Sequence, residues 1–334
     1  MRGHAIEARI CAENPDANFL PATGTLQVAR WPVHVAFQTD DVRPRVDTGF
    51  VEGDAISPWY DSMIAKLIVW GEDRAQALAR LDAALRDTHL VGLHTNVGFL
   101  RRVVGSRSFA QADLDTALIE REREVLFNVP GLPLRWALAG VVAHLLANEA
   151  DGQGADPWSR TDGWRLHGLS RRRLHVEQGG QRHEVLLELT HDGMPVLELQ
   201  GERMALDLRA LGERRHDVTL AGHRQNLTVH AVGRRFSIFG ATGHAVLDLL
   251  VAGGASGDTA AAGGLNAPMP GKLISLLVNP GQAVRQGQAL AVMEAMKMEH
   301  TISAPRDGVV AQWLHGVGDQ VAEGAELLKM EVAA

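Results

Sequence analysis

Cysteine is almost absent from this sequence of 334 residues, and the single one is Cys11. One cysteine excludes an intramolecular disulfide and a zinc site built on cysteines, and it fits a reducing compartment. Long apolar runs are lacking too, since none reaches the roughly 20 residues that span a bilayer. The first residues, MRGHAIEARI, carry charge throughout and lack the apolar core of a signal peptide. We therefore expect a cytoplasmic protein with no membrane partner.

An excess of positive charge is also lacking. The chain has 33 lysines and arginines against 40 aspartates and glutamates, which gives a formal net charge of -7. This balance offers no broad basic surface for nucleic acid. The arginine clusters at 171–173 and 214–215 are too short to change this, and we expect them to be solvated ends of strands. The length allows two or three domains.

An internal repeat occupies the C-terminal part of the chain. Residues 267–294 align without gaps with residues 304–331, so that Gly271 matches Gly308 and Met293 matches Met330. Each copy shows turn signals with glycine between short, alternating apolar strands. A unit this small cannot bury its own apolar face, and two copies are expected to share one core. We predict an all-β flattened sandwich with quasi-twofold symmetry over residues 266–334.

The link between the two copies contains the residues of chemical interest. Glu294 to Met298 forms a predicted hairpin corner, with Lys297 between two methionines. A single lysine is most often a solvated surface residue. An exposed lysine flanked by Met296 and Met298 at the one turn joining two symmetric halves favours a function instead, because exposed methionines suit an adaptable contact surface.

The sequence Ala295-Met296-Lys297-Met298, preceded by Glu294, resembles the biotinylation motif of the biotinyl domains of biotin-dependent carboxylases. The resemblance implies that Lys297 receives biotin as an amide from a biotin protein ligase, to which the tight turn presents the amine. Lipoyl domains share the fold and also place a lysine at the turn, but they typically have aspartate before it. Met296 therefore favours biotin over lipoate.

A segment rich in glycine and alanine precedes the repeat, over residues 252–265. Residues 252 to 264 contain no large apolar side chain and cannot pack a core. We predict a flexible linker with a reach of roughly 20 Å. Such a tether would keep the carrier at high effective concentration near its docking sites.

The preceding part, residues 128–251, predicts one long helix and many short strands. Pro133 to Ala150 is apolar around most of its circumference and is followed by a Gly-rich stop. Seven alternating runs separated by turn signals then predict an antiparallel β-barrel or sandwich of about seven or eight strands, with the helix against or inside it. These runs are 173–177, 183–190, 194–200, 204–209, 214–221, 223–232 and 235–241.

We identify no catalytic group in this part of the chain. Its scattered histidines form no helical metal-binding pair, and we expect them at solvent-facing strand positions. They are His167, His175, His183, His191, His216, His223, His230 and His244. The arrangement resembles the domain that joins carboxylase and carrier in the alpha subunits of acyl-CoA carboxylases, which implies contact with a carboxyltransferase beta subunit. Residues 156–158 (DPW) and 162–165 (DGWR) resemble the methylcrotonyl-CoA type most.

Residues 1–127 read as an α+β layer, with a strand over 6–10 and a helical pattern over 72–90. Several of its segments together resemble the C-terminal subdomain of biotin carboxylase. These are Arg2 to Ile10, Phe19 to Gly24, Tyr60 to Leu67, and Thr95-Asn96.

Arg9 is the catalytic candidate of this region. By the resemblance it matches the arginine that faces the ureido oxygen of biotin, where a cation would stabilise the enolate that forms as the ring nitrogen loses its proton. From the residues alone, an ordinary surface ion pair would account for it. Asp61 is a lesser candidate, for which a structural role is favoured.

An ATP-grasp core is lacking. In the family that the chain resembles, a Gly-rich lid, a phosphate-binding lysine and magnesium-binding carboxylates precede the point where this sequence begins. No Gly-rich phosphate loop occurs in residues 1–125, and Gly271-Lys272 is not followed by serine or threonine. We therefore assign no ATP-binding or metal-binding residues here, and expect ATP and Mg to act only with the missing half. The hypothesis is an incomplete alpha subunit, from a truncated or split reading frame or a laboratory fragment, that cannot carboxylate biotin alone.

Two functions are compatible with this organisation. The first is part of an acyl-CoA carboxylase alpha subunit, a biotin-dependent ligase, whose biotin takes a carboxyl group from the biotin carboxylase site to the beta subunit. The acyl-CoA stays open, with 3-methylcrotonyl preferred over geranyl, propionyl and acetyl, and so does the stoichiometry. The alternative is a non-catalytic biotin carrier and scaffold that works with a separate ATP-grasp chain. A lipoyl carrier of a 2-oxoacid dehydrogenase complex is disfavoured by Met296 and by the N-terminal resemblance.

Overall fold

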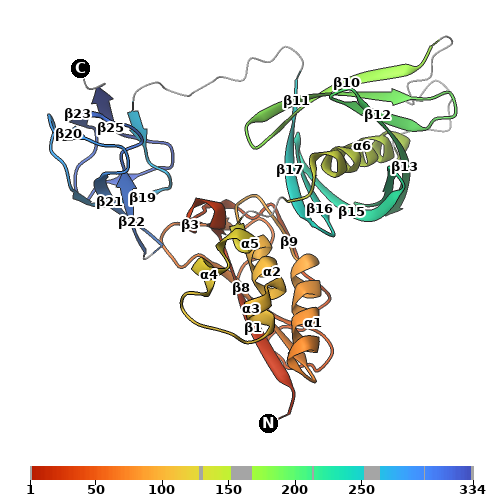
Figure 1. Cartoon of the computed structure of the whole chain (residues 1–334), viewed down its shortest axis with the longest axis horizontal. Helices are drawn as coiled ribbons and strands as arrows, with labels where there is room; N and C mark the ends of the chain where they lie inside the picture. Colours follow the sequence, from red (N-terminus) through yellow and green to blue (C-terminus); the bar gives the residue numbers. More distant parts are fainter. Residues whose placement is uncertain are drawn as a thin grey trace. The chain divides into compact units, whose positions relative to one another are not determined.

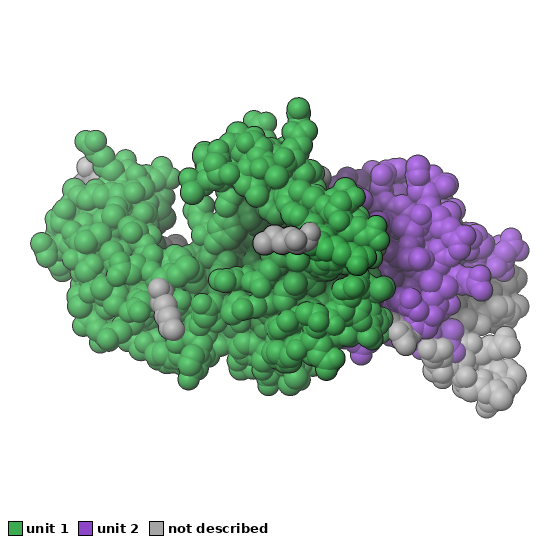
Figure 2. Space-filling view, turned by 90° about the horizontal axis from the view of Figure 1, so that it is seen from below, with its two compact units in different colours: residues 1–127, 256–334 green, residues 128–255 purple. Residues whose placement is uncertain are grey.

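The computed structural model describes residues 2–127, 131–151, 168–212, 214–251, 264–296 and 298–331. The chain divides into two compact units, coloured separately in Figure 2. One unit is residues 128–255, and the other combines residues 1–127 with residues 256–334. Within the second unit, residues 2–127 are called the N-terminal region and residues 264–331 the carrier region. Most of the predicted linker, His167, and the segments 156–158 and 162–165 lie outside the described residues.

A three-stranded antiparallel sheet organises the N-terminal region, in the order β1-β8-β6. Along β1 the side chains alternate, so that Ala8 and Ile10 are buried while Glu7 and Arg9 are exposed. The buried residues join one hydrophobic cluster with apolar residues of helix α1, such as Leu81. One face of the sheet therefore packs on the core, and the other carries charged side chains. The strands are β1 (His4–Cys11), β6 (Arg45–Thr48) and β8 (Met63–Gly71), and α1 is Arg74–Arg86.

Short elements complete this region, which is drawn in red to yellow in Figure 1. They are β2 (Glu13–Asn14), η1 (Pro15–Ala17), β3 (Leu20–Pro21), β4 (Gly24–Thr25), β5 (Val28–Arg30), β7 (Ala55–Ile56), β9 (His89–Val91), α2 (Val97–Gly105), α3 (Arg107–Ala110), α4 (Leu118–Arg121) and α5 (Arg123–Phe127).

Helix α1 is shorter than the pattern over 72–90 predicts. The Asp73 side chain accepts a hydrogen bond from the backbone N–H of Gln76 at 2.8 Å and caps the start. At the other end the helix stops at Arg86, and the Thr88 hydroxyl donates to the carbonyl oxygen of Ala84 at 2.8 Å. Leu90, which continued the apolar pattern, lies in β9 and pairs with β5.

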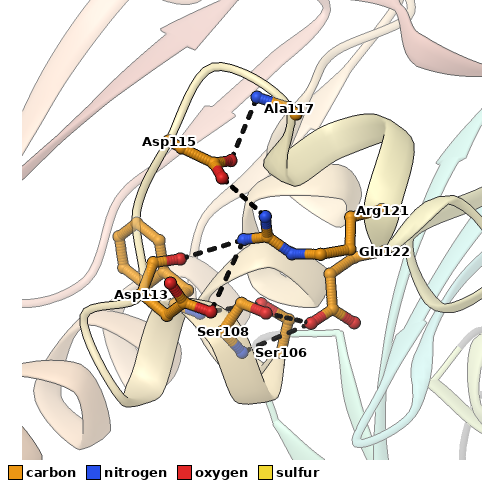
Figure 3. A network of polar contacts seen from close by, with 8 residues as sticks. Ser106, Ser108, Asp113, Asp115, Ala117, Arg121 and Glu122 are labelled. Atoms are coloured by element: carbon orange, nitrogen blue, oxygen red, sulfur yellow. Dashed lines mark hydrogen bonds and ion pairs between the residues drawn. The ribbon is translucent and has the colours of Figure 1, made fainter.

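A network of polar contacts holds the loop between α3 and α4 (Figure 3). Arg121 donates to the Asp115 carboxylate at 2.6 Å and to the backbone carbonyl of Asp113 at 3.1 Å. Glu122 accepts from the backbone N–H of Ser108 at 3.3 Å and also from the hydroxyl of Ser108. The hydrogen bond from Arg121 lowers the pKa of Asp115. These contacts fix a loop that has little apolar burial of its own.

The unit of residues 128–255 is a closed antiparallel barrel of eight strands, β10 to β17. Its strands are β10 (Ser170–Gln178), β11 (Gln181–Leu189), β12 (Pro195–Leu199), β13 (Glu202–Gly212), β14 (Arg215–Leu220), β15 (His223–Val232), β16 (Arg235–Gly240) and β17 (Gly243–Leu250). The barrel closes where β10 pairs with β17. The eighth strand, β17, was not among the predicted runs, whereas the predicted helix is present as α6 (Leu134–Asp151).

Helix α6 fills the concave side of the barrel sheet, as Figure 1 shows. Ala137, Leu138 and Val142 of α6 are fully buried, in one cluster with inward-facing residues of the strands. Gly140 allows the close approach, since a Cβ atom there would lie 2.9 Å from Cγ2 of Ile238. The helix is apolar on most sides because the sheet surrounds it.

Two histidines of the barrel correct the expectation of solvent-facing positions. His216 on β14 and His230 on β15 are 4% and 1% exposed, so that prediction is wrong for them. At His216 the physical reason is the helix inside the barrel, which makes inward-facing positions a filled core. His230 alternates with the core residue Val229 and so lies on the other face of β15, where its ring packs edge-on against that of Phe239, with centroids 5.7 Å apart. The ring of His144 on α6 meets that of His216 edge-on, with centroids 5.9 Å apart. His191, His223 and His244 are exposed as expected.

The carrier region is a sandwich of two four-stranded sheets, in the orders β18-β25-β23-β20 and β22-β21-β19-β24. The two copies of the repeat exchange strands, because β20 of the first copy lies with β23 and β25 of the second, and β24 lies with β19 and β21. The predicted quasi-twofold sandwich is confirmed. The strands are β18 (Gly264–Asn266), β19 (Gly271–Leu276), β20 (Ala283–Val284), β21 (Ala289–Ala295), β22 (Met298–Ser303), β23 (Gly308–Trp313), β24 (Gln320–Val321) and β25 (Glu326–Glu331).

The two copies of the repeat are alike even in individual contacts between strands. A Cβ atom added to Gly271 would lie 2.6 Å from the carbonyl oxygen of Glu294, and one added to Gly308 would lie 2.7 Å from that of Glu331. Each glycine thus lets two neighbouring strands approach where a side chain would collide. The same requirement recurs at equivalent positions because both copies fold in the same way.

Candidate functional site

The biotinylation motif lies at the hairpin between β21 and β22. Ala295 of β21 pairs with Met298 of β22, so only two residues connect the strands, and Met296 is the one that the structure describes. The strands therefore continue further than predicted, and the corner is two residues instead of five. Met296 has a φ of 48°, which places it in the left-handed region that short hairpin turns use. Lys297 itself lies outside the described residues.

The two methionines beside Lys297 differ in burial. Met298 is 37% exposed, whereas Met296 is 4% exposed. The expectation that both present an exposed contact surface is therefore wrong for Met296. Ala295 is also buried, and Glu294 is exposed. Two buried residues, Ala295 and Met296, therefore come directly before position 297 in the chain.

Arg9 lies on the open face of the β1-β8-β6 sheet. It pairs with Lys66 of β8, which in turn pairs with Asp47 of β6, so the three side chains form one row across the sheet. In the next row, Glu7 of β1 and Arg45 of β6 flank the middle strand. This face therefore gathers three cations and two carboxylates from three strands.

The charges of this face are paired unevenly. Arg45 and Asp47 form an ion pair at 2.6 Å, and the hydrogen bond from Arg45 lowers the pKa of Asp47, with a smaller contribution from the charge of Lys66. Arg9 contacts only Glu7 at 3.5 Å among the described residues, and its side chain is 69% exposed. Its guanidinium thus has N–H groups to offer an external carbonyl or anionic oxygen.

Asn96 holds the backbone of β1 beside Arg9, a role that the sequence did not reveal. Its side-chain oxygen accepts from the backbone N–H of Cys11 at 2.9 Å, and its side-chain amide donates to the carbonyl oxygen of Arg9 at 3.1 Å. Asn96 is buried, so these bonds form away from solvent. No periodic pattern marks such a clamp, because its partners are 85 and 87 residues away in the chain.

Asp61 has a local structural contact. Its carboxylate accepts from the backbone N–H of Met63 at 2.9 Å, where β8 begins. The neighbouring Ser62 donates its hydroxyl to Glu13 at 2.5 Å and joins the loop to β2. These contacts support the structural role for Asp61 that the sequence favoured.

Within the described residues, no group of three or more histidine, cysteine or carboxylate side chains could hold a metal ion. None of the helices described is both long and apolar enough to cross a membrane.

Three family models match the chain in succession. They are the biotin carboxylase C-terminal domain over residues 7–121, the BT domain of the methylcrotonyl-CoA carboxylase alpha subunit over 133–250, and the biotin-requiring enzyme domain over 264–330. The chain is a methylcrotonyl-CoA carboxylase alpha-subunit-like chain. It combines an α+β region, an eight-stranded barrel with a central helix, and an all-β biotinyl domain.

Relatives match over nearly all of the chain. The mitochondrial methylcrotonoyl-CoA carboxylase subunit alpha of Dictyostelium discoideum is 34% identical, over 97% of this chain and 48% of the relative. That of Rattus norvegicus is 31% identical, over 99% of this chain and 47% of the relative. A solved biotin carboxylase domain of a thermophilic 2-oxoglutarate carboxylase is 31% identical over 38% of this chain and 27% of its own, with a TM-score of 0.35. The chain spans about half the length of the curated relatives it matches.

Proposed function

We propose that this chain is the biotin-carrying part of an acyl-CoA carboxylase alpha subunit, with biotin on Lys297. The observation that carries the proposal is the β21-β22 hairpin, whose strand ends and two-residue connection together make up the complete Ala-Met-Lys-Met motif within a biotinyl-type sandwich. Buried residues precede the attachment position, and an exposed methionine follows it. We infer that a hairpin connection at this place would present the amine of Lys297 to a modifying enzyme.

Biotin bound there would supply a ring nitrogen that accepts a carboxyl group and a flexible arm that moves it. The residues of this chain would hold the turn, and Arg9 would bind the ureido oxygen. A guanidinium that is largely free to hydrogen-bond stabilises negative charge as it develops on that oxygen. Asn96 would keep the Arg9 segment of β1 in register.

The proposed partners are a biotin protein ligase, an ATP-grasp biotin carboxylase half, and a carboxyltransferase beta subunit. The proposed acceptor is 3-methylcrotonyl-CoA, which is supported by the BT-domain match over residues 133–250. A transfer assay with the biotinylated chain and separately supplied partners would compare 3-methylcrotonyl-CoA with propionyl-CoA. Faster consumption of propionyl-CoA would overturn this choice of acceptor.

The test of the carrier role is the intact mass of the chain after expression with a biotin ligase and biotin. We expect a mass increase of one biotin, which Lys297→Arg abolishes. Lys272→Arg is the matched control, because Lys272 is an exposed lysine on β19 of the same region and should leave the increase intact. An unmodified wild-type chain with a folded carrier region would refute the carrier role.

A further inference from the structure

Met296 is buried by the N-terminal region and not by its own sandwich. Its side chain belongs to the hydrophobic cluster that contains Ile10, Ile56 and Leu67. The two clusters of the carrier region, as far as the residues are described, do not include it. The residue that precedes the attachment position is therefore inserted into another region of the same compact unit.

A backbone hydrogen bond fixes this insertion. The N–H of Met296 donates to the carbonyl oxygen of Pro58 at 2.9 Å. Pro58 lies in the loop of residues 57–62 between β7 and β8, where Trp59 and Tyr60 are 64% and 73% exposed. This N–H therefore has a partner outside its own hairpin.

A second contact joins the same two regions along the strand that follows the turn. A cavity of about 310 Å³ is lined by Asn18 and Leu20 of the N-terminal region and by Leu265, His300 and Ile302 of the carrier region. The Nε2 atom of His300 is buried and has no hydrogen-bond partner among the described residues. The carrier region thus meets the N-terminal region both at its turn and along β22.

The loop that receives Met296 is tied to the strand of Arg9. The N–H of Ala12 donates to the carbonyl oxygen of Ser62 at 2.7 Å, and Cys11 pairs with Met63. Arg9 lies two residues before Cys11, which is about 7 Å along a strand. The loop that receives Met296 therefore adjoins the end of the sheet that carries Arg9.

We propose that loop 57–62 is the docking site of the biotinylation turn and that Met296 is the positioning residue that seats the turn there. This inference rests on the proposed function, since it concerns the site to which biotin on Lys297 would be delivered. Methionine suits the task, because its unbranched side chain fills an existing gap without a demand for one shape. At the turn itself, one such side chain and one backbone hydrogen bond stabilise the contact only modestly.

The experiment is photo-crosslinking of the full chain with p-benzoylphenylalanine in place of Trp59, next to Pro58. We expect a crosslink to the peptide that contains residues 291–300. Met296→Gln, which keeps the length but adds a polar group, should lower the yield about tenfold, and Met296→Leu should retain most of it. Met298→Gln is the matched control and should leave the yield unchanged, because Met298 is exposed.

The docking proposal would be overturned if Met296→Gln left the crosslinking yield unchanged, or if Met298→Gln lowered the yield by the same factor. Intact mass measured on the same samples keeps the two proposals apart. A crosslink that depends on Met296 in a chain that never takes up biotin would refute the carrier function and leave the docking contact standing. Full biotinylation together with a crosslinking yield that does not depend on Met296 would support the carrier function and refute the docking contact.

Discussion

Arg9 differs from the other arginine of its sheet in how firmly it is held. Arg45 is paired with Asp47 at 2.6 Å, whereas the one contact of Arg9 that is described is a 3.5 Å approach to Glu7 on an exposed strand face. An exposed pair of this kind contributes little to stability. The side chain is therefore free to bind a ligand without loss of a structural contact.

Arg9→Gln separates stability from activity. We expect the free energy of unfolding to change by less than about 0.5 kcal/mol, since the side chain is exposed. With an ATP-grasp half supplied, carboxylation of biotin should fall about 100-fold, as for loss of one donor to a developing negative charge. Urea unfolding and bicarbonate-dependent carboxylation measure the two effects. Arg43→Gln, on another exposed arginine of this region, should change neither, and equal rates for both variants would contradict the role of Arg9.

Position 271 needs a glycine because no side chain fits there, and its backbone angles do not demand one. A methyl group there would meet the carbonyl oxygen of Glu294 at 2.6 Å, just before the biotinylation turn. We expect Gly271→Ala to destabilise the carrier region by roughly 1–3 kcal/mol, the usual range for overpacking. Gly308→Ala should cost a similar amount, because the repeat places it against Glu331.

The measurement is thermal unfolding of the full chain, followed by a probe within the carrier region. Gly316→Ala is the control, because its Cβ atom would meet only a carboxylate oxygen of Asp319 at 3.7 Å. A transition equally low in Gly316→Ala would show that the effect is general to glycine substitution and that the contact with Glu294 is irrelevant.

At the scale of elements, the contact between α6 and the barrel contains a pair of histidines. Burial lowers the pKa of His144 and of His216; the charge of Arg214 adds to the effect at His144, and that of His144 adds to it at His216. Asn148 also contacts His144. The Nε2 atom of His216 is buried and has no hydrogen-bond partner among the described residues. Both rings therefore bind a proton less readily in the folded barrel than in the unfolded chain.

The barrel should lose stability as the pH falls below about 6.5. A base with a lowered folded pKa binds fewer protons in the folded state than in the unfolded state, so its contribution is intact above the unfolded pKa and declines below it. We expect the urea midpoint of the barrel to drop between pH 7.5 and pH 5.5. His216→Leu should reduce this drop, and His223→Leu, at an exposed position, should not. A drop of the same size in all three proteins would contradict the assignment to His216.

The elements also show what sequence patterns can and cannot reveal. Alternation located seven of the eight barrel strands, because each was bounded by turn residues. The strand β17, Gly243–Leu250, escaped because its last residues run into the Gly/Ala-rich segment, and its apolar residues form a block instead of an alternation. The burial of His216 depends on α6 lying inside the barrel. The alternation of apolar residues in the strands does not predict which face of the sheet the helix covers, so this burial could not be predicted from the sequence.

At the scale of the whole molecule, the order of the three domains could be read from motifs, whereas the contacts between distant segments could not. The repeat at a constant offset predicted the sandwich, and Ala-Met-Lys-Met predicted its role. The burial of Met296 depends on Pro58 and the cluster around Ile56, more than 230 residues earlier in the chain. No local pattern contains such a partner, so Met296 was expected on the surface.

The contact between the biotinylation turn and loop 57–62 should depend on both being part of one chain. The sequence predicts a flexible linker of about 13 residues before the carrier region, and a tether of that length would give an effective concentration in the millimolar range, which a weak contact needs. We therefore introduce a protease site within residues 252–263 and measure the crosslink from position 59 before and after cleavage. The intact chain should crosslink to the same extent on dilution from about 100 to 1 µM, whereas the cleaved chain should lose the crosslink, because these concentrations lie far below the effective value. A cleaved chain that crosslinks undiminished at 1 µM would mean that the contact is tight enough to hold the carrier permanently, which is incompatible with a carrier that must leave for a second site.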